Sequence, residues 1–284
     1  MMFKNAVIYR APQALPVFDL SGSPFTPCGP TQRASVGWTP PRGEQGGALI
    51  ESIAGQWIME VTIQTRTVPP AALRKRVDEM AEAIERDTGR KPGKKARREL
   101  TEHAELELLP HAFPKTSKVP VWIDTAAGLV VLDTASAGAA DVVFTLLAQS
   151  GLSPLAPINT NISPASLMTC WLSDGAPDVE EFDLGDECEL RNAETKATVR
   201  HAKCDLDTAE VKSHVRAGLH AIKLGLEWSA KVAFTLTDGL TLRKITFVDV
   251  QPGEFDADVA IMTGTLAPLI ADLIAALDGE VQSA

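Results

Sequence analysis

Residues 69–110 have the sequence PPAALRKRVDEMAEAIERDTGRKPGKKARRELTEHAELELLP. Apolar side chains recur in it every three or four residues, which is typical of one face of an α-helix. They are first Leu73, Val77, Met80 and Ile84, and then Ala96, Leu100, Ala104 and Leu108. Glycine and proline at positions 89, 92 and 93 separate the two series, and such residues end helices. The stretch therefore predicts a helical hairpin over residues 70–117, with its second helix ending before Pro110.

The loop of this hairpin and the start of its second helix are strongly basic. Six of the nine residues from 90 to 98 are cations: Arg90, Lys91, Lys94, Lys95, Arg97 and Arg98. Residues 70–98 hold ten Lys/Arg against five Asp/Glu, a charge of +5, so the rest of a chain with net charge -10 carries -15. A basic surface on an acidic body favours binding of a polyanion. A merely solvated helix face stays open as the alternative, because charged runs often have no ligand.

Strand patterns flank the hairpin on both sides. Apolar and β-branched runs at residues 3–9 and 48–67 precede it, and a loop rich in glycine and proline covers 11–41. Residues 118–135 follow it as two strands around a turn. A helix over 137–149 then leads to a proline-rich connector at 153–164. Beyond it we expect helices at 164–172, 207–217 and 257–277, and strands at 187–191, 198–203, 221–228, 232–237 and 240–250.

These elements predict an α+β fold made of two sheet-and-helix units. The first unit is expected over residues 1–69 and 118–160, with the hairpin at 70–117 inserted into it as a tip. The second unit is expected over residues 161–284. Each unit shows strands, a turn, more strand and then a helix, so the two units have a similar order of elements.

Composition indicates a cytosolic protein. The 284 residues are 45% hydrophobic, enough to bury a large core without disulfides. Four dispersed cysteines form no CxxC pair, and the first ten residues lack the apolar segment of a secretion signal. The longest apolar stretch, 257–277, contains Asp258 and Asp272, which argues against a membrane span. We therefore expect a cytoplasmic protein without a membrane partner.

The sequence contains no motif that indicates catalysis. Residues 89–95, GRKPGKK, lack the glycine spacing and the Ser/Thr of a phosphate-binding loop. Cys188, His201 and Cys204 are thirteen and three residues apart and do not form the two close ligand pairs of a structural zinc site. Four carboxylates have no matching His or Lys with which to perform acid–base chemistry, so we expect them to be solvated side chains in the approach to a strand. They are Asp183, Asp186, Glu187 and Glu189. We expect no enzymatic activity, no catalytic residue, no metal and no cofactor.

Several unusual strings run through the whole chain. They are FKN (3–5), FTPCG (25–29), GW.PP (37–41), LLP.AF (108–113), WID (122–124), LGDECELR (184–191), L.LEW (224–228) and FDADVAIMTG (255–264). Together they resemble the RdgC recombination-associated proteins, nearly from end to end. The resemblance implies an α+β protein that forms a closed ring-shaped homodimer, with a positively charged hole that admits duplex DNA.

The resemblance also implies where DNA is contacted. The hairpin would meet its counterpart in a second subunit, with Arg90, Lys91 and Lys94 lining the hole and Lys95, Arg97 and Arg98 beside them. Lys115 and Lys118 would lie near that contact, and Arg200 and Lys203 at the opposite contact of the ring.

Two hypotheses for function follow. In the first, the chain is a non-catalytic protein of the nucleoid that binds DNA without sequence specificity and restrains a RecA-type recombinase in recombination and replication. Double-stranded DNA is the expected ligand, with single strands as an open alternative. In the second, the chain is a protein-interaction module that contacts the recombinase directly, and the basic run is only a solvated face.

Overall fold

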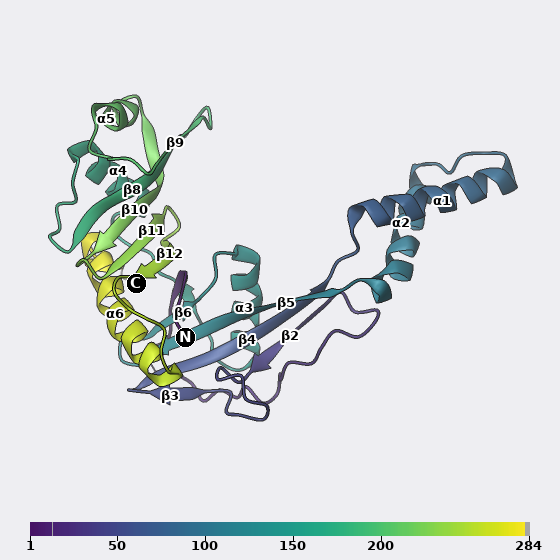
Figure 1. The fold of residues 1–284 in the computed structure, drawn as a ribbon, viewed down its shortest axis with the longest axis horizontal. Helices are drawn as coiled ribbons and strands as arrows, with labels where there is room; N and C mark the ends of the chain where they lie inside the picture. Colours follow the sequence, from purple (N-terminus) through teal and green to yellow (C-terminus); the bar gives the residue numbers. More distant parts are fainter. Residues whose placement is uncertain (13, 282–284) are drawn as a thin grey trace. The chain divides into compact units, whose positions relative to one another are not determined.

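The computed structural model describes residues 1–12 and 14–281 (Figure 1). The chain divides into two compact units. Unit 1 comprises residues 1–19, 40–59 and 120–284, and unit 2 comprises residues 20–39 and 60–119. The boundaries of these two units differ from those expected at residues 69, 117 and 160.

Twelve strands of the described chain form one sheet, which with the helices gives the expected α+β fold. The order is β2-β4-β5-β6-β1-β12-β11-β10-β8-β9, with β3 paired to β4 and β7 to β1. The strands are β1 (Ala6–Arg10), β2 (Ala34–Thr39), β3 (Glu51–Ile53), β4 (Gln56–Arg66), β5 (Pro114–Asp124), β6 (Leu129–Leu132), β7 (Ala156–Pro157), β8 (Phe182–Asn192), β9 (Thr198–Ala202), β10 (Leu219–Trp228), β11 (Val232–Thr237) and β12 (Thr241–Phe247).

Six α-helices accompany the strands in the described residues. They are α1 (Pro70–Thr88), α2 (Lys94–Leu108), α3 (Ala137–Gln149), α4 (Pro164–Asp174), α5 (Ala209–Arg216) and α6 (Phe255–Ala276), with a short 3-10 turn, η1 (Leu109–His111), after α2. Each expected helix is present, and the bounds of α3 agree with the sequence pattern at both ends.

Strand β1 joins distant parts of the sequence within unit 1. Its Val7 lies opposite Leu132 of β6 on one side and Thr241 of β12 on the other, both antiparallel. In the strand order, β4, β5 and β6 stand on one side of β1, and β12, β11 and β10 on the other. In the chain, α3 follows β4, β5 and β6, and α6 follows β10, β11 and β12. This repeat of strands followed by a helix is the similarity between the two units that the sequence predicts.

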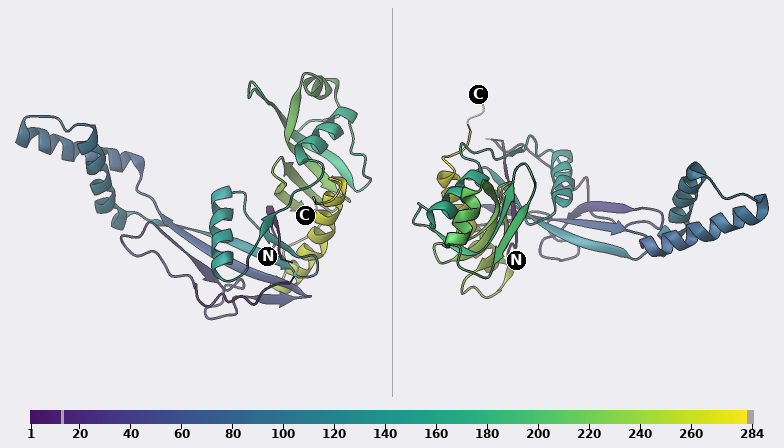
Figure 2. Two further views of the ribbon diagram at one scale, coloured as in Figure 1. Left: turned by 180° about the vertical axis from the view of Figure 1, so that it is seen from behind. Right: turned by 90° about the horizontal axis from the view of Figure 1, so that it is seen from above.

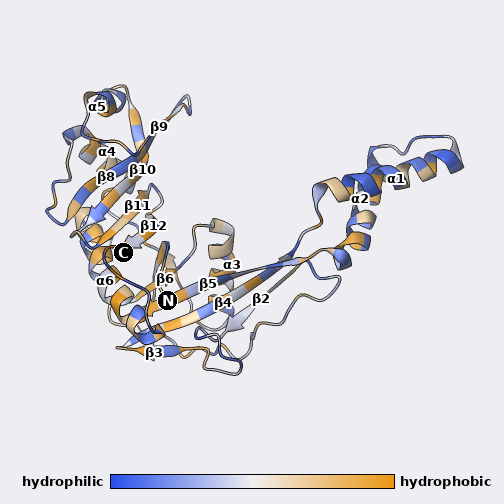
Figure 3. Cartoon of the chain, in the orientation of Figure 1, coloured by the Kyte–Doolittle hydropathy of each residue, from blue (hydrophilic) through white to orange (hydrophobic). Residues whose placement is uncertain are grey.

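The core of unit 1 lies between its strands and three helices. Helices α4 and α5 pack against β10 and against each other, as the two views of Figure 2 also show. Helix α6 is long and apolar enough to cross a membrane by length and composition (Figure 3). Eight of its residues are buried, among them Val259, Leu266 and Ile270 in the same cluster as the strand side chains. Burial in this core accounts for the apolar composition of α6.

Unit 2 contains β2, parts of β4 and β5, and the hairpin of α1 and α2. Strand β2 lies inside the stretch that the sequence pattern assigned to a loop, so that expectation is wrong for residues 34–39. The reason is a close approach at Gly37, where a Cβ atom would come within 2.4 Å of the Cα of Phe25. Only glycine fits there, and a short strand with glycine inside it has a weak sequence signal.

Strand β8 also differs from its expected bounds. It begins at Phe182, five residues before the expected start, and so includes Asp183 and Asp186, which were expected to precede it. Its pairing with β10 shifts register twice, and a Cβ at Gly185 would come within 2.9 Å of the backbone of Gly225. Such irregularities break the alternation of apolar and polar residues by which strands are recognised.

Candidate nucleic-acid interface

The hairpin of unit 2 is held by a thin apolar contact. Val77 of α1 and Ala104 of α2 are its buried residues, and the rest of both apolar stripes is partly exposed. A second small cluster of Val68, Leu109 and Ala112 fixes the base of the hairpin. Most residues of α1 and α2 have the blue of hydrophilic residues in Figure 3. Most side chains of the hairpin are therefore exposed to solvent, and only one residue of each helix is buried.

The loop between the helices is ordered by its own backbone bonds. Helix α1 ends at Gly89, which has φ +71 and donates its N–H to the Glu85 carbonyl at 2.8 Å. Glycine adopts this left-handed conformation without steric cost. The Thr88 hydroxyl donates to the Ile84 carbonyl at 2.7 Å and accepts the Arg90 N–H at 3.4 Å. The loop is therefore a defined turn that carries basic side chains.

Four of the six basic residues form an unpaired group, which we call the loop cluster: Arg90, Lys91, Lys94 and Lys95. All four are exposed, and none forms an ion pair with a carboxylate in the part of the chain that the structure describes. Residues 88–98 contain no Asp or Glu. Unpaired cations this close together repel one another, and a polyanion relieves that repulsion.

Arg97 and Arg98 differ from the loop cluster because each has a carboxylate partner. Arg97 forms an ion pair with Asp78 across the hairpin, and Arg98 pairs with Glu102 at 3.2 Å one turn further along α2. Arg76 makes similar bonds to Glu79 and Glu107. The basic run thus divides into four free and two neutralised cations.

The first turn of α2 adds to the positive potential of the loop cluster. Lys94 and Lys95 open this helix, no side chain caps it, and no acidic residue occupies its first turn. The first N–H groups of a helix lack intrahelical acceptors and carry a partial positive charge. Phosphate groups bind well to such ends when cationic side chains surround them.

Lys115 and Lys118 lie on β5 and differ in their surroundings. Lys115 is exposed and has no ion pair among the described residues. The Lys118 ammonium is 2.7 Å from the Glu60 carboxylate, which is only 5% exposed and also accepts a hydrogen bond from the Thr39 hydroxyl at 3.1 Å. Lys118 therefore neutralises a buried acid in unit 2.

We expect Lys118→Ala to destabilise unit 2 by about 1–2 kcal/mol, because it leaves the buried Glu60 carboxylate with one neutral donor; the half-exposed ammonium keeps the cost below that of a fully buried pair. Lys115→Ala is the matched control on the same strand and should change stability by less than about 0.5 kcal/mol. Urea unfolding followed by circular dichroism measures both. Equal effects of the two substitutions would contradict the structural role of Lys118.

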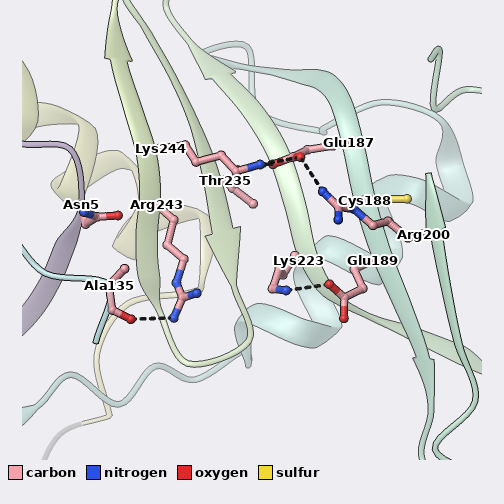
Figure 4. A pocket seen from close by; sticks show the side chains of 10 residues that line it. All are labelled: Asn5, Ala135, Glu187, Cys188, Glu189, Arg200, Lys223, Thr235, Arg243 and Lys244. Carbon is pink, nitrogen blue, oxygen red and sulfur yellow. Dashed lines mark hydrogen bonds and ion pairs between the residues drawn. The ribbon is translucent and has the colours of Figure 1, made fainter. Parts of the chain in front are cut away.

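Unit 1 carries a second basic surface, a cavity of about 270 Å³ that we call the sheet pocket (Figure 4). Its lining has four cations and two carboxylates: Arg200, Lys223, Arg243, Lys244, Glu187 and Glu189. Lys223 pairs with Glu189 at 2.6 Å, and Glu187 pairs with Lys244 at 2.6 Å and with Arg200 at 3.8 Å. The lining retains a net charge of +2.

A bulge in β12 places Lys244 in this pocket. Thr235 pairs with Arg243 and Ala233 with Thr246, so two residues of β12 face one residue of β11. Lys244 has φ +53 at this point and reaches Glu187 on β8. The Lys244 ammonium, helped by the Thr235 hydroxyl, lowers the pKa of Glu187, so this carboxylate is charged at neutral pH.

Arg243 contributes an unused donor. Its Nη2 donates to the Ala135 carbonyl at 2.9 Å, while its buried Nε–H has no hydrogen-bond partner among the described residues. A buried donor without an acceptor is costly, and an anion in the pocket would satisfy it. Neither Arg243 nor Lys244 was singled out from the sequence, because the bulge that aims them cannot be seen in the residue pattern.

Arg200 and Lys203 lie where the sequence places the strand-to-helix segment. Arg200 is on β9 and lines the sheet pocket, and exposed Lys203 follows β9 with φ +57. Both also line a neighbouring depression with Lys244. The structure thus brings Arg200 and Lys203 together with the newly found Lys244 on one basic surface.

The carboxylates and the cysteine that the sequence analysis tested as catalytic or metal-binding residues have surroundings that differ from those expected. Glu187 and Glu189 are ion-paired members of β8, so the interpretation of the carboxylates as a solvated approach to a strand is wrong for these two. Cys188 is buried, and burial, with a smaller contribution from Cys204, raises its pKa to about 11. A thiol with such a pKa stays protonated at neutral pH and is a poor metal ligand.

Comparison with known proteins gives matches over the full chain. A family model described as "RdgC: Putative exonuclease, RdgC" matches residues 1–280. The chain is 35% identical over 302 residues to a "Recombination-associated protein RdgC" from Janthinobacterium sp. (strain Marseille), covering 99% of both chains. It is 34% identical to the protein of that name from Dechloromonas aromatica (strain RCB), covering all of both chains. It is 32% identical over 302 residues to the protein of that name from Salmonella paratyphi B (strain ATCC BAA-1250 / SPB7), covering 99% of both chains.

Proposed function

Because the chain belongs to the RdgC family of recombination-associated proteins, as its sequence strings predict, we propose that it binds DNA without sequence specificity. Double-stranded DNA is the ligand, and the bound protein restrains a RecA-type recombinase on the nucleoid in the cytoplasm. The observation that carries this proposal is the loop cluster, four exposed cations in the loop and at the start of α2 that have no carboxylate partner among the described residues.

The chemistry of the loop cluster favours the DNA backbone over the bases. Lys and Arg that approach phosphates release condensed counterions, a gain that does not depend on sequence. Base stacking has little support, because residues 88–98 contain no aromatic side chain. The sheet pocket, with its net positive lining and the free Nε–H of Arg243, supports a second contact with phosphate.

We further propose that two copies form the ring that the family resemblance implies. A hairpin-to-hairpin contact is supported by exposed apolar side chains of unit 2, since Phe113 is 95% and Leu106 is 56% exposed. Large apolar side chains rarely remain in water when a partner surface exists. A ring would retain duplex DNA by enclosure, so the acidic remainder of the chain would not prevent binding.

We propose that the DNA-binding role does not include cleavage, although the family description contains the word exonuclease. A nuclease that uses metal ions needs free carboxylates that converge on the ions. Glu187 and Glu189, the partly buried members of the acidic group on β8, are instead held by Lys244, Arg200 and Lys223. In the alternative, a module that only contacts the recombinase, the loop cluster would be a solvated face without a ligand.

The test is a mobility shift of two unrelated duplexes and a single strand over a range of salt concentrations. We expect affinities for the two duplexes to agree within a few fold and to fall steeply with salt. Size exclusion should give twice the mass of one chain. A strong preference for one duplex, or binding that is insensitive to salt, would contradict the proposal, and a monomer would remove the ring.

A further inference from the structure

Three side chains with metal-binding atoms meet in unit 1, and none of them lines the sheet pocket. His201 comes from β9, and Glu210 and His214 come from α5. One ligand atom from each residue lies within 4.8 Å of the other two. Neither the sequence motifs nor the proposed function involves this group.

Local structure holds the three residues in place. Glu210 and His214 are four residues apart and so lie on the same face of α5, with His214 Nε2 4.0 Å from the Glu210 carboxylate. The Thr208 side chain accepts the Val211 N–H at 3.3 Å and fixes the start of this helix. The rings of His201 and His214 have centroids 5.7 Å apart and are inclined at 49°.

His201 has an unsatisfied ring nitrogen. Its Nε2 atom is buried and has no hydrogen-bond partner among the described residues. A ring nitrogen that is buried without a hydrogen-bond partner or a metal costs free energy, whether it carries the proton or the lone pair. A metal ion bonded to Nε2 would remove this cost.

We propose that His201, Glu210 and His214 bind one zinc ion per chain. Two imidazoles and one carboxylate are donors that zinc accepts at about 2.0–2.2 Å, with water completing a tetrahedron. Hard ions such as Mg²⁺ and Ca²⁺ prefer oxygen ligands only, so the two histidines select against them. Glu210 is exposed, so a change of its side-chain rotamer would close the remaining separation between its carboxylate and the ion.

Zinc at this position would join α5 to β9. Helix α5 has eight residues, too few to be stable in isolation, and it is held by the buried Val211, by the Thr208 cap and by packing against α4 and β10. A bond from each of the two elements to one ion would therefore hold the segment between them, which contains Lys203, in one conformation.

The experiment uses full-length protein freed of metal by a chelator and titrated with zinc alone in a calorimeter. We expect one zinc per chain, with affinity at least about tenfold lower in His214→Gln and in Glu210→Gln. His220→Gln is the matched control, because His220 is an exposed histidine of the same unit outside the cluster. It should bind zinc like the wild type.

Cobalt(II) provides a second readout that does not depend on affinity. Its visible absorption in the wild-type protein should have the intensity of a four-coordinate site and should be lost in the double variant His201→Gln/His214→Gln. The single variants His214→Gln and Glu210→Gln should retain the circular dichroism spectrum of the wild type, since helix α5 tolerates glutamine. Absence of zinc binding, or zinc binding unchanged in His214→Gln, would overturn the proposal and would leave the DNA-binding proposal untouched.

Discussion

Replacing Arg90, Lys91, Lys94 and Lys95 together by alanine is expected to lower affinity for duplex DNA by roughly 10³-fold at about 0.1 M salt. Each phosphate contact contributes about 0.9 to the slope of log affinity against log salt, so four lost contacts reduce the slope by about 3.6. All four side chains are exposed and unpaired, and their removal should not alter stability by more than about 0.5 kcal/mol. Mobility shifts over a salt series measure both quantities.

The double variant Arg97→Ala/Arg98→Ala is the matched control for this prediction. These cations belong to the same run but already pair with Asp78 and Glu102, so they have less free charge to offer a phosphate. We expect this double variant to lose less than about tenfold in affinity for duplex DNA. Equal losses in both variants would show that pairing does not decide which cations bind DNA. An unchanged salt slope in the quadruple variant would remove the loop cluster from the interface.

The largest expected effect on stability comes from Trp171→Ala in α4. The indole is only 1% exposed, lies 5.7 Å from the ring of Phe182, and donates its N–H to Asp178 at 2.7 Å. Removing it opens a cavity in the unit 1 core and should cost about 3–5 kcal/mol. Urea unfolding at a fixed temperature measures this loss as a lower midpoint with an unchanged slope.

Two further variants separate the contributions of packing and hydrogen bonding at Trp171. Trp171→Phe keeps most of the buried ring and loses the N–H, and Asp178→Asn keeps an acceptor for that N–H. We expect each to cost no more than about 1.5 kcal/mol. A cost for Trp171→Phe close to that of Trp171→Ala would mean that the bond to Asp178, and not the filled core, stabilises this region.

The elements with strong local periodicity could be predicted from the sequence. The hairpin follows from apolar residues at helical spacing and from glycine at position 89, which needs no tertiary information. Strand β11 was likewise visible because alternation and a following turn define it. The basic character of the candidate interface is a property of composition and was apparent in the same way.

What the sequence could not supply are contacts between distant residues. The pairing of Arg97 with Asp78 depends on how α1 and α2 face each other, and the reach of Lys244 to Glu187 depends on a bulge. Cys188 pairs with His201 across β8 and β9, yet the ligand atoms that gather with His201 come from Glu210 and His214, whose approach depends on how α5 packs. Spacing in the sequence indicates ligand pairs only when one element carries both.

The position of β1 in the sheet also bears on how the protein is made. The Met1 ammonium bonds to Asp258 at 2.5 Å across 257 residues, and Ala6 pairs with Leu242. Contacts at such separation slow folding, because a long loop must close before they form. During synthesis β1 can pair with β6 first, and the side of β1 that faces β12 stays unpaired until β12 has left the ribosome. Unit 2 draws only on residues within 20–119, whereas unit 1 also needs the strands and helices that follow residue 120 before its core is complete.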